Sequence, residues 1–133
     1  MIDIENQIYT KIATALRADF EGITVSGEYV KAPPSFPFVS IVEQDNYTTR
    51  SHLDSSDNER YVTLMYEINI YSDRAGQKKA ICKKIAKYID DMMYKLNFRR
   101  TSLSPVPNLE NATIYRLVGR YSAETDGTQI YRG

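Results

Sequence analysis

Few side chains of this protein could take part in catalysis, and they are not grouped as catalysis requires. His52 is the only histidine and Cys82 the only cysteine of the 133 residues. A general base has to be held in place by a second group, and His52 lies in a run of small polar residues that offers none. Cys82 falls on the apolar side of an expected helix, where a thiol packs as a small hydrophobic group and is inert. We therefore expect no catalytic residue and no enzyme activity.

The acidic residues do not form a recognisable metal site. Asp54, Asp57 and Glu59 lie close together, but they lack the alternate spacing and the central glycine of a calcium-binding loop. Asp90 and Asp91 are neighbours on an expected helix, so their side chains point about 100° apart and cannot share a metal ion or a proton. There is no glycine-rich phosphate loop, no nucleophile elbow and no cysteine–histidine set for zinc. We expect neither a metal nor a cofactor.

Charge is balanced overall and uneven along the chain. Seventeen basic and seventeen acidic side chains give a net charge of zero, which argues against a nucleic-acid-coating protein. Residues 1–66 carry five basic and ten acidic side chains, whereas residues 67–133 carry twelve basic and seven acidic ones. The asymmetry either reflects solvated helix faces and loops or gives the molecule an acidic and a basic side that can associate head to tail. The lysines at 78, 79, 83 and 84 fit a solvated helix face, so we expect no sequence-specific nucleic-acid binding.

The N-terminal sequence favours neither export nor insertion into a membrane. Residues 1–5 are acidic where a signal peptide is positively charged. No apolar stretch approaches the roughly 20 residues of a membrane-spanning helix. We expect a soluble protein that has no membrane partner.

The first third of the chain is expected to form one helix and two strands. Ile4, Ile8 and Ile12 are spaced four apart, which predicts an amphipathic helix over 3–19. Asp3 could cap this helix, and Gly22 could end it. A weak strand over 23–30, a stiff proline-containing connector over 31–35 and a short apolar strand over 38–43 follow.

The stretch 44–60 has one leucine and no other large aliphatic residue, which predicts a long, mobile polar loop. Loops this long in small domains are usually functional or disordered, so we expect this one to bind a partner. The candidate contact residues are Arg50, His52, Asp54 and Asp57.

The second half contains the clearest strand of the sequence. Alternation over 60–72 predicts a central strand, with Thr63, Glu67 and Asn69 on its second face. If that face meets solvent, Glu67→Ala should change stability by less than about 0.5 kcal/mol. The residues expected on the core side are Val62, Leu64, Tyr66, Ile68 and Ile70.

The rest of the chain is expected to complete one α+β domain. A helix over 74–96 should be capped by Ser72 or Asp73 and end at Asn97 in a left-handed turn. Residues 99–111 are expected to be a connector, and 113–122 and 128–132 to be strands. The sequence therefore predicts a single domain over 1–133, in which two helices pack on a mixed, mostly antiparallel sheet.

The order and type of the expected elements form a pattern that covers most of the chain. Its segments are the helix ending near Phe20, PFVSIVE at 37–43, the polar loop, YEINIYS at 66–72, the helix 76–96 and YRLVGRYS at 115–122. In this pattern the sequence resembles the tail-terminator (tail-completion, head–tail joining) proteins of long-tailed bacteriophages and prophages. Asn97-Phe98 stands where glycine followed by an aromatic residue is expected, and asparagine also tolerates the left-handed turn.

This resemblance implies a structural virion protein without catalytic residues. Such a protein is made in the host cytoplasm and forms a homohexameric ring on the head-proximal end of the tail tube. The ring stops tube polymerisation and offers a surface to the neck or head-completion protein. Two alternatives stay open: a capsid-side connector or minor tail component, and a small enzyme or ligand-binding module.

Overall fold

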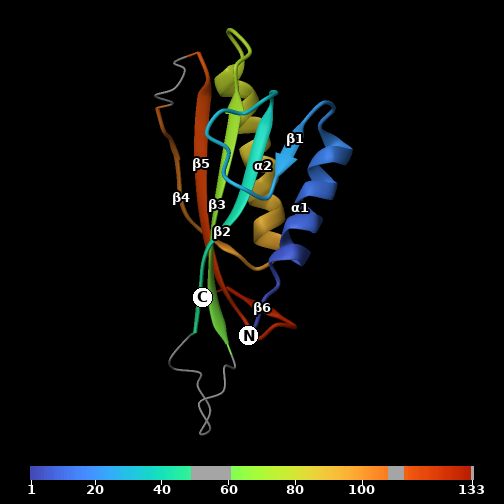
Figure 1. The fold of residues 1–133 in the computed structure, drawn as a ribbon, viewed down its shortest axis with the longest axis vertical. Coiled ribbons are helices and arrows are strands. Elements are labelled where there is room, and N and C mark those ends of the chain that lie inside the picture. The colour runs from blue at the N-terminus through green and yellow to red at the C-terminus, as the bar shows by residue number, and fades with distance from the viewer. Residues whose placement is uncertain (49–60, 108–112, 133) are drawn as a thin grey trace, which may run out of the picture.

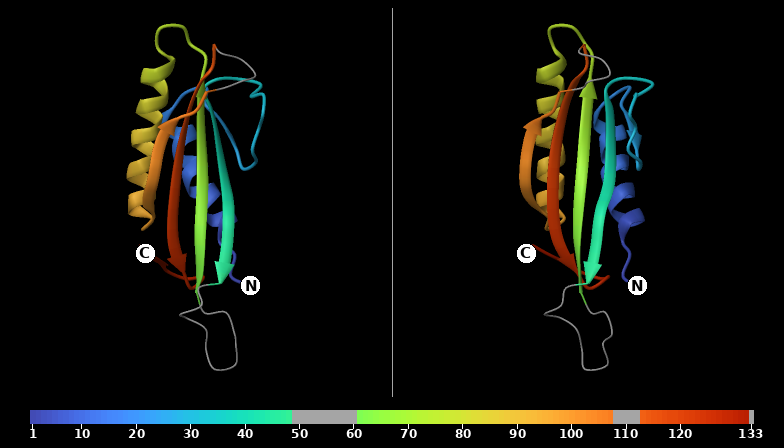
Figure 2. Two further views of the ribbon diagram at one scale, coloured as in Figure 1. Left: turned by 90° about the vertical axis from the view of Figure 1, so that its left-hand side faces the viewer. Right: turned by 60° about the vertical axis from the view of Figure 1, so that its left-hand side comes forward.

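A computed structural model describes residues 1–48, 61–107 and 113–132, which form a mixed sheet with two helices on one of its faces (Figures 1 and 2). The strands run in the order β1-β2-β3-β5-β4, and β6 pairs with β5. The β1–β2 pair is parallel and all the others are antiparallel. The expected α+β class is confirmed. In chain order the elements are α1 (Glu5–Asp19), β1 (Thr24–Ser26), β2 (Phe38–Thr48), β3 (Val62–Ser72), α2 (Lys78–Lys95), β4 (Arg99–Pro105), β5 (Tyr115–Thr125) and β6 (Ile130–Tyr131).

The core lies between the two helices and the sheet, and β3 is its central strand. As predicted, the alternate residues of β3 from Val62 to Ile70 are buried against the helices. Helix α1 contributes Ile8, Ile12 and Leu16 to the same cluster. Its first turn is held by the Asp3 carboxylate, which accepts a hydrogen bond from the Glu5 N–H at 3.1 Å.

Helix α2 begins later than the sequence predicts and ends where it predicts. It starts at Lys78, and neither Ser72 nor Asp73 caps it. Gly76 has a positive φ of 77°, so the chain turns there before the helix can start. At the other end, Asn97 adopts a φ of 67°. The Phe98 N–H then donates to the Met93 carbonyl and the Asn97 N–H to the Tyr94 carbonyl, which is the Schellman arrangement.

Strand β2 is longer than the predicted 38–43 and occupies the start of the expected polar loop. Residues 44–48 continue the strand, with Asp45 opposite Met65 and Thr48 opposite Val62. The prediction of a loop was wrong for these residues, because the paired β3 supplies hydrogen-bond partners for a polar segment that has no strand pattern of its own. Residues 49–60 lie outside the described part.

The predicted connector over 99–111 also contains a strand. Residues 99–105 form β4, which pairs with β5 at the edge of the sheet. Its side chains are mostly exposed, so it lacks the alternation of apolar residues that reveals an interior strand. Pro105 is tolerated because it ends an edge strand, where one ladder hydrogen bond is dispensable.

Candidate functional site

Two of the side chains considered for catalysis or metal binding, Cys82 and Asp90, make contacts within the fold. Cys82 is fully buried, and its Sγ lies 3.7 Å from the carbonyl oxygens of Ile70 and Tyr115. Burial raises the pKa of this thiol to about 12, so it stays protonated near neutral pH. Asp90 accepts a hydrogen bond from the Tyr121 hydroxyl at 3.1 Å and forms an ion pair with Arg100.

The predicted partner-binding residues cannot be placed. Arg50, His52, Asp54 and Asp57 all fall within 49–60, outside the described residues. Within the described residues, no three histidine, cysteine or acidic side chains gather closely enough to hold a metal ion. The two described helices also lack an apolar stretch of the length needed to span a bilayer.

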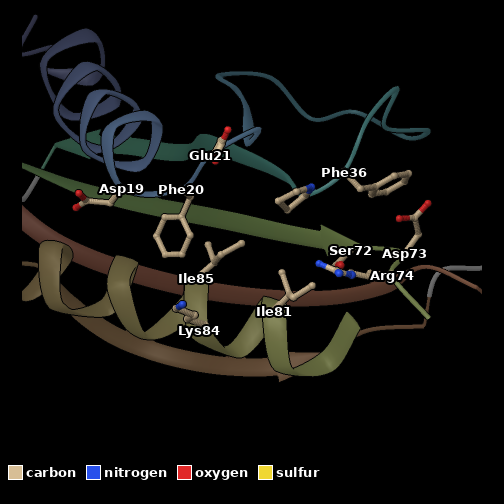
Figure 3. Close-up of a pocket in the computed structure, with 11 residues that line it drawn as sticks. Asp19, Phe20, Glu21, Phe36, Ser72, Asp73, Arg74, Ile81, Lys84 and Ile85 are labelled. Carbon is tan, nitrogen blue, oxygen red and sulfur yellow. The ribbon is translucent and has the colours of Figure 1, made fainter. Parts of the chain in front are cut away.

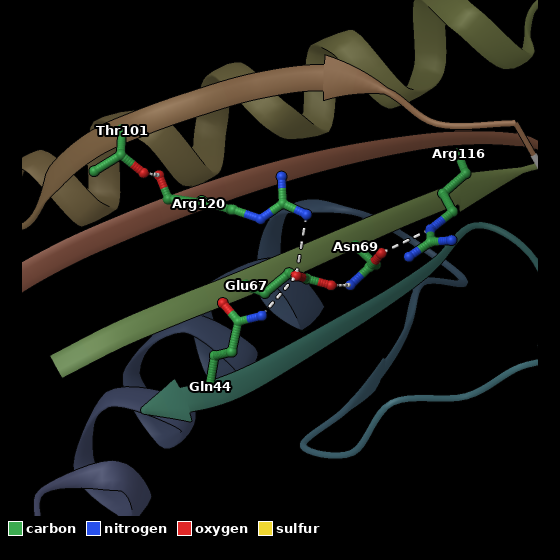
Figure 4. A network of polar contacts seen from close by, with 6 residues as sticks. All are labelled: Gln44, Glu67, Asn69, Thr101, Arg116 and Arg120. Atoms are coloured by element: carbon green, nitrogen blue, oxygen red, sulfur yellow. Dashed lines mark hydrogen bonds and ion pairs between the residues drawn. The ribbon is translucent and has the colours of Figure 1, made fainter. Parts of the chain in front are cut away.

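The face of the sheet that the helices leave open carries a connected polar network (Figure 4). Asn69 of β3 is fully buried and lies at its centre. Its side-chain oxygen accepts a hydrogen bond from Arg116 Nε at 2.8 Å, and its nitrogen donates to Glu67 at 3.1 Å. Glu67 also accepts from Gln44 at 3.2 Å and forms an ion pair with Arg120 at 3.4 Å. The network therefore joins β2, β3 and β5.

Aromatic rings continue this network at one end. The Arg116 guanidinium lies 5.7 Å from the centre of the Tyr29 ring and 5.9 Å from that of Tyr71. Tyr71 packs edge-to-face with Phe38. Tyr29, from the segment between β1 and β2, is 53% exposed. The open face thus combines exposed aromatic area with fixed charges, a combination common in protein–protein contacts.

We expect Asn69→Ala to lower the free energy of unfolding by about 1–3 kcal/mol, because it leaves charged partners without their hydrogen bonds. The Glu67 carboxylate also has hydrogen-bond and ion-pair partners on this face. The small effect of Glu67→Ala was expected only if the face met solvent, and that condition is not met. Gln44→Ala is the control, since it removes an exposed member of the network and should cost less than about 0.5 kcal/mol. Urea unfolding measures both, and equal effects would contradict a central role for Asn69.

A cleft of about 550 Å³ lies between the end of α1 and the start of α2 (Figure 3). Its apolar lining includes Phe20, Ile81 and Ile85 of the helical side, together with Phe36 and Pro37. Charged residues, among them Asp19 and Lys84, also line it. The Tyr88 hydroxyl donates to Asp19 and to the Ala15 carbonyl, and its ring packs edge-to-face on Phe20. These contacts tie the two helices together beside the cleft.

The second half of β2 carries two acidic residues, Glu43 and Asp45. Burial and the nearby carboxylates of Glu5 and Asp3 raise the pKa of Glu43 to about 7. The Tyr66 hydroxyl donates a weak hydrogen bond of 3.5 Å to Glu43 and opposes this shift in part.

This raised pKa predicts a pH-dependent effect of Glu43→Gln. A raised pKa in the folded state means that protonation of Glu43 favours folding below about pH 4.5, and this stabilisation is lost as the pH rises through 7. Because the group is partly exposed, we expect the variant to be more stable than the parent by about 1–2 kcal/mol at pH 8. The gain should shrink to a small part of this near pH 5.

Thermal melts of the monomeric protein at the two pH values measure this difference. Glu28→Gln, at an exposed position between β1 and β2, is the control and should behave alike at both. A Glu43→Gln gain that persists unchanged at the lower pH would contradict the prediction.

No model of a known protein family matches the chain. A search of curated proteins likewise finds no match. What the described structure defines is a class of architecture: an α+β domain with helices on one face of its sheet and a polar network on the other.

Proposed function

We propose that this protein is a structural component of a long-tailed bacteriophage or prophage particle that terminates the tail. In this proposal it is made in the host cytoplasm and assembles as a homohexameric ring on the head-proximal end of the tail tube. The ring stops addition of tail-tube protein and presents a surface to the neck or head-completion protein. The resemblance in element order and segment pattern supports this proposal.

The observation that carries the proposal is the arrangement of the sheet. Both helices cover one face (Figure 2), and among the described residues β4 ends the sheet on one side, while on the other β1 covers only residues 38–40 of β2. A domain with two open edges on opposite sides can contact a copy of itself on each side. Unlike surfaces that meet in this way generate a ring when the rotation closes. Assembly is therefore the activity that the fold supports best.

The residues that connect β2 to β3 remain our candidate for the contact with tube or neck. In the sequence these residues, Arg50, His52, Asp54 and Asp57, come between Thr48, the last residue of β2, and Val62, the first of β3, which lie opposite each other in the sheet. This assignment rests on the sequence.

The experiment is to add the purified protein to tail tubes assembled without their terminator and to image them by negative-stain electron microscopy. We expect a ring at one end of each tube and a stop to further growth when tube protein is added. Tubes that keep growing at both ends, with no added density, would overturn the proposal. Density at the portal of empty capsids instead would favour the capsid-side connector.

A ligand-binding module is the alternative from another class, and the cleft between α1 and α2 favours it. Its apolar side chains and its volume of about 550 Å³ suit a small organic molecule. This alternative predicts a protein that stays monomeric and is stabilised thermally by such a ligand. A protein that forms rings, and whose assembly is unchanged by Ile81→Ala in the cleft, would argue against it.

A further inference from the structure

The two edges of the sheet carry opposite charges at the same level. Arg100 of β4 lies opposite Tyr121, which lies opposite Tyr66, which lies opposite Glu43 of β2. The neighbouring row runs from Arg99 through Ser122 and Met65 to Asp45. Each row therefore begins with an arginine on one edge and ends with a carboxylate on the other.

The two rows lie on different faces of the sheet. Arg100 forms its ion pair with Asp90 of α2 at 3.4 Å, and Glu43 lies near Glu5 of α1, so this row is on the helix side. Arg99 and Asp45 belong to the row of Ser122 and Met65, which alternates with the row of Tyr121 and Tyr66 and therefore faces the open side. Both of these side chains are exposed.

Each edge has further charge of the same sign. Arg132 lies beside Arg99 and Arg100 around a small depression, with its guanidinium 3.9 Å from the centre of the Tyr94 ring. On the other edge, Asp3 and Glu5 lie near Glu43. The edges are thus a basic patch (Arg99, Arg100, Arg132) and an acidic patch (Glu43, Asp45, Asp3, Glu5).

The strand directions allow these edges to meet in a ring. Successive antiparallel pairs make β2 and β4 run in opposite directions, so β4 of one copy would lie antiparallel to β2 of the next. A closed ring is generated by rotation without translation along its axis. If the axis runs along the strands, residues at the same level on the two edges come together.

Irregularities in both strands indicate that side chains make this contact. The ladder of β2 shifts register at Gln44, and that of β4 shifts at Thr101. Bulges of this kind disrupt regular strand pairing and redirect side chains. Continuous backbone pairing is therefore interrupted at the level where the arginines and carboxylates lie.

We propose that copies of this chain associate head to tail through these two patches, the basic patch of one copy against the acidic patch of the next. This contact joins neighbouring copies in the ring of the proposed function, and the inference therefore rests on that function. Complementary charges fix the register of such an interface and exclude wrong pairings. The partner is a second copy of this chain.

Charge reversal at the exposed pair tests the contact. Arg99→Glu and Asp45→Arg should each abolish ring formation on tail tubes, because like charges then face each other. The double variant restores opposite charges and should restore the ring. An equimolar mixture of the two single variants should do so as well, because alternating copies satisfy every contact in a ring with an even number of subunits.

Two further variants control for charge and folding. Lys79→Glu and Glu21→Arg make the same charge changes at exposed positions outside the patches and should leave rings intact. Circular dichroism melts should show that all variants fold, since none of the changed side chains is buried.

The outcomes separate this inference from the function on which it rests. If the parent protein forms rings and the single reversals form them equally well, the patches are not the interface, while the tail-terminator proposal stands. If both single variants fail and neither the double variant nor the mixture recovers, the patches do not face each other and the inference is overturned. A parent protein that neither forms rings nor caps tubes overturns both.

Discussion

Ile68→Asp should prevent the domain from folding. Ile68 lies in the middle of the central strand, 1% exposed, between Ile41 of β2 and Gly119 of β5. It is part of the cluster between the sheet and the helices. A carboxylate placed among these apolar side chains is buried at a cost of several kcal/mol, which is comparable to the total stability of a small domain. We expect no cooperative thermal transition and a largely unfolded circular dichroism spectrum.

Two substitutions make this test specific. Ile68→Val keeps the site apolar and should cost only about 0.5–1.5 kcal/mol. Ser122→Asp places a carboxylate on the open face, opposite Arg99, and should change stability by less than about 0.5 kcal/mol. A folded, cooperatively melting Ile68→Asp protein would show that the helices do not cover this face of β3.

Phe98→Ala should lower the free energy of unfolding by about 3–5 kcal/mol. The ring is 1% exposed and packs edge-to-face on Tyr66, with 5.4 Å between the ring centres. The same residue closes α2, since its N–H donates to the Met93 carbonyl at 2.8 Å. Truncation leaves a cavity where the end of the helix meets the sheet, so packing and the helix end are both weakened.

Tyr94→Ala is the matched control for this second prediction. Tyr94 is an aromatic residue of the same helix, but 63% of it is exposed, and Arg132 lies over its ring. An exposed cation–π contact contributes about 0.5–1 kcal/mol, so this variant should lose no more than that. Equal losses from the two variants in urea unfolding would mean that Phe98 does not anchor the helix end.

The elements that the sequence predicted best are those whose burial pattern repeats. Burial in strand β3 alternates from Val62 to Ile68 because one face packs on the helices. The turn at Asn97 is marked by a residue that tolerates a positive φ. Strand β4 was missed because its side chains are mostly exposed, and residues 44–48 were missed because only their pairing with β3 makes them a strand. The turn at Gly76 makes α2 start later than predicted. The spacing of the apolar residues of the helix carries no sign of this turn.

The polar network was harder to foresee than the core. Asn69 and Glu67 read as ordinary residues of a solvated face, and their partner Arg116 lies 47 positions from Asn69 in sequence. Only the pairing of β3 with β5 brings Arg116 to Asn69. The acidic first half and the basic second half of the sequence are consistent with an acidic and a basic edge. Only the register of four strands shows that the arginines of β4 and the carboxylates of β2 lie at the same level.

The irregularities at Gln44 and Thr101 bear on how the open edges of this sheet resist pairing with further strands. Open sheet edges are templates for uncontrolled growth into fibres, since each unpaired strand can recruit another. A register shift on each edge breaks the template, one on either side of the row that joins Arg100 to Glu43. The charged side chains beside these shifts repel a copy that arrives with like edges facing. Correcting both irregularities, by deleting Gln44 and Thr101, would therefore remove a barrier to fibril formation while leaving the helices and the central strand in place.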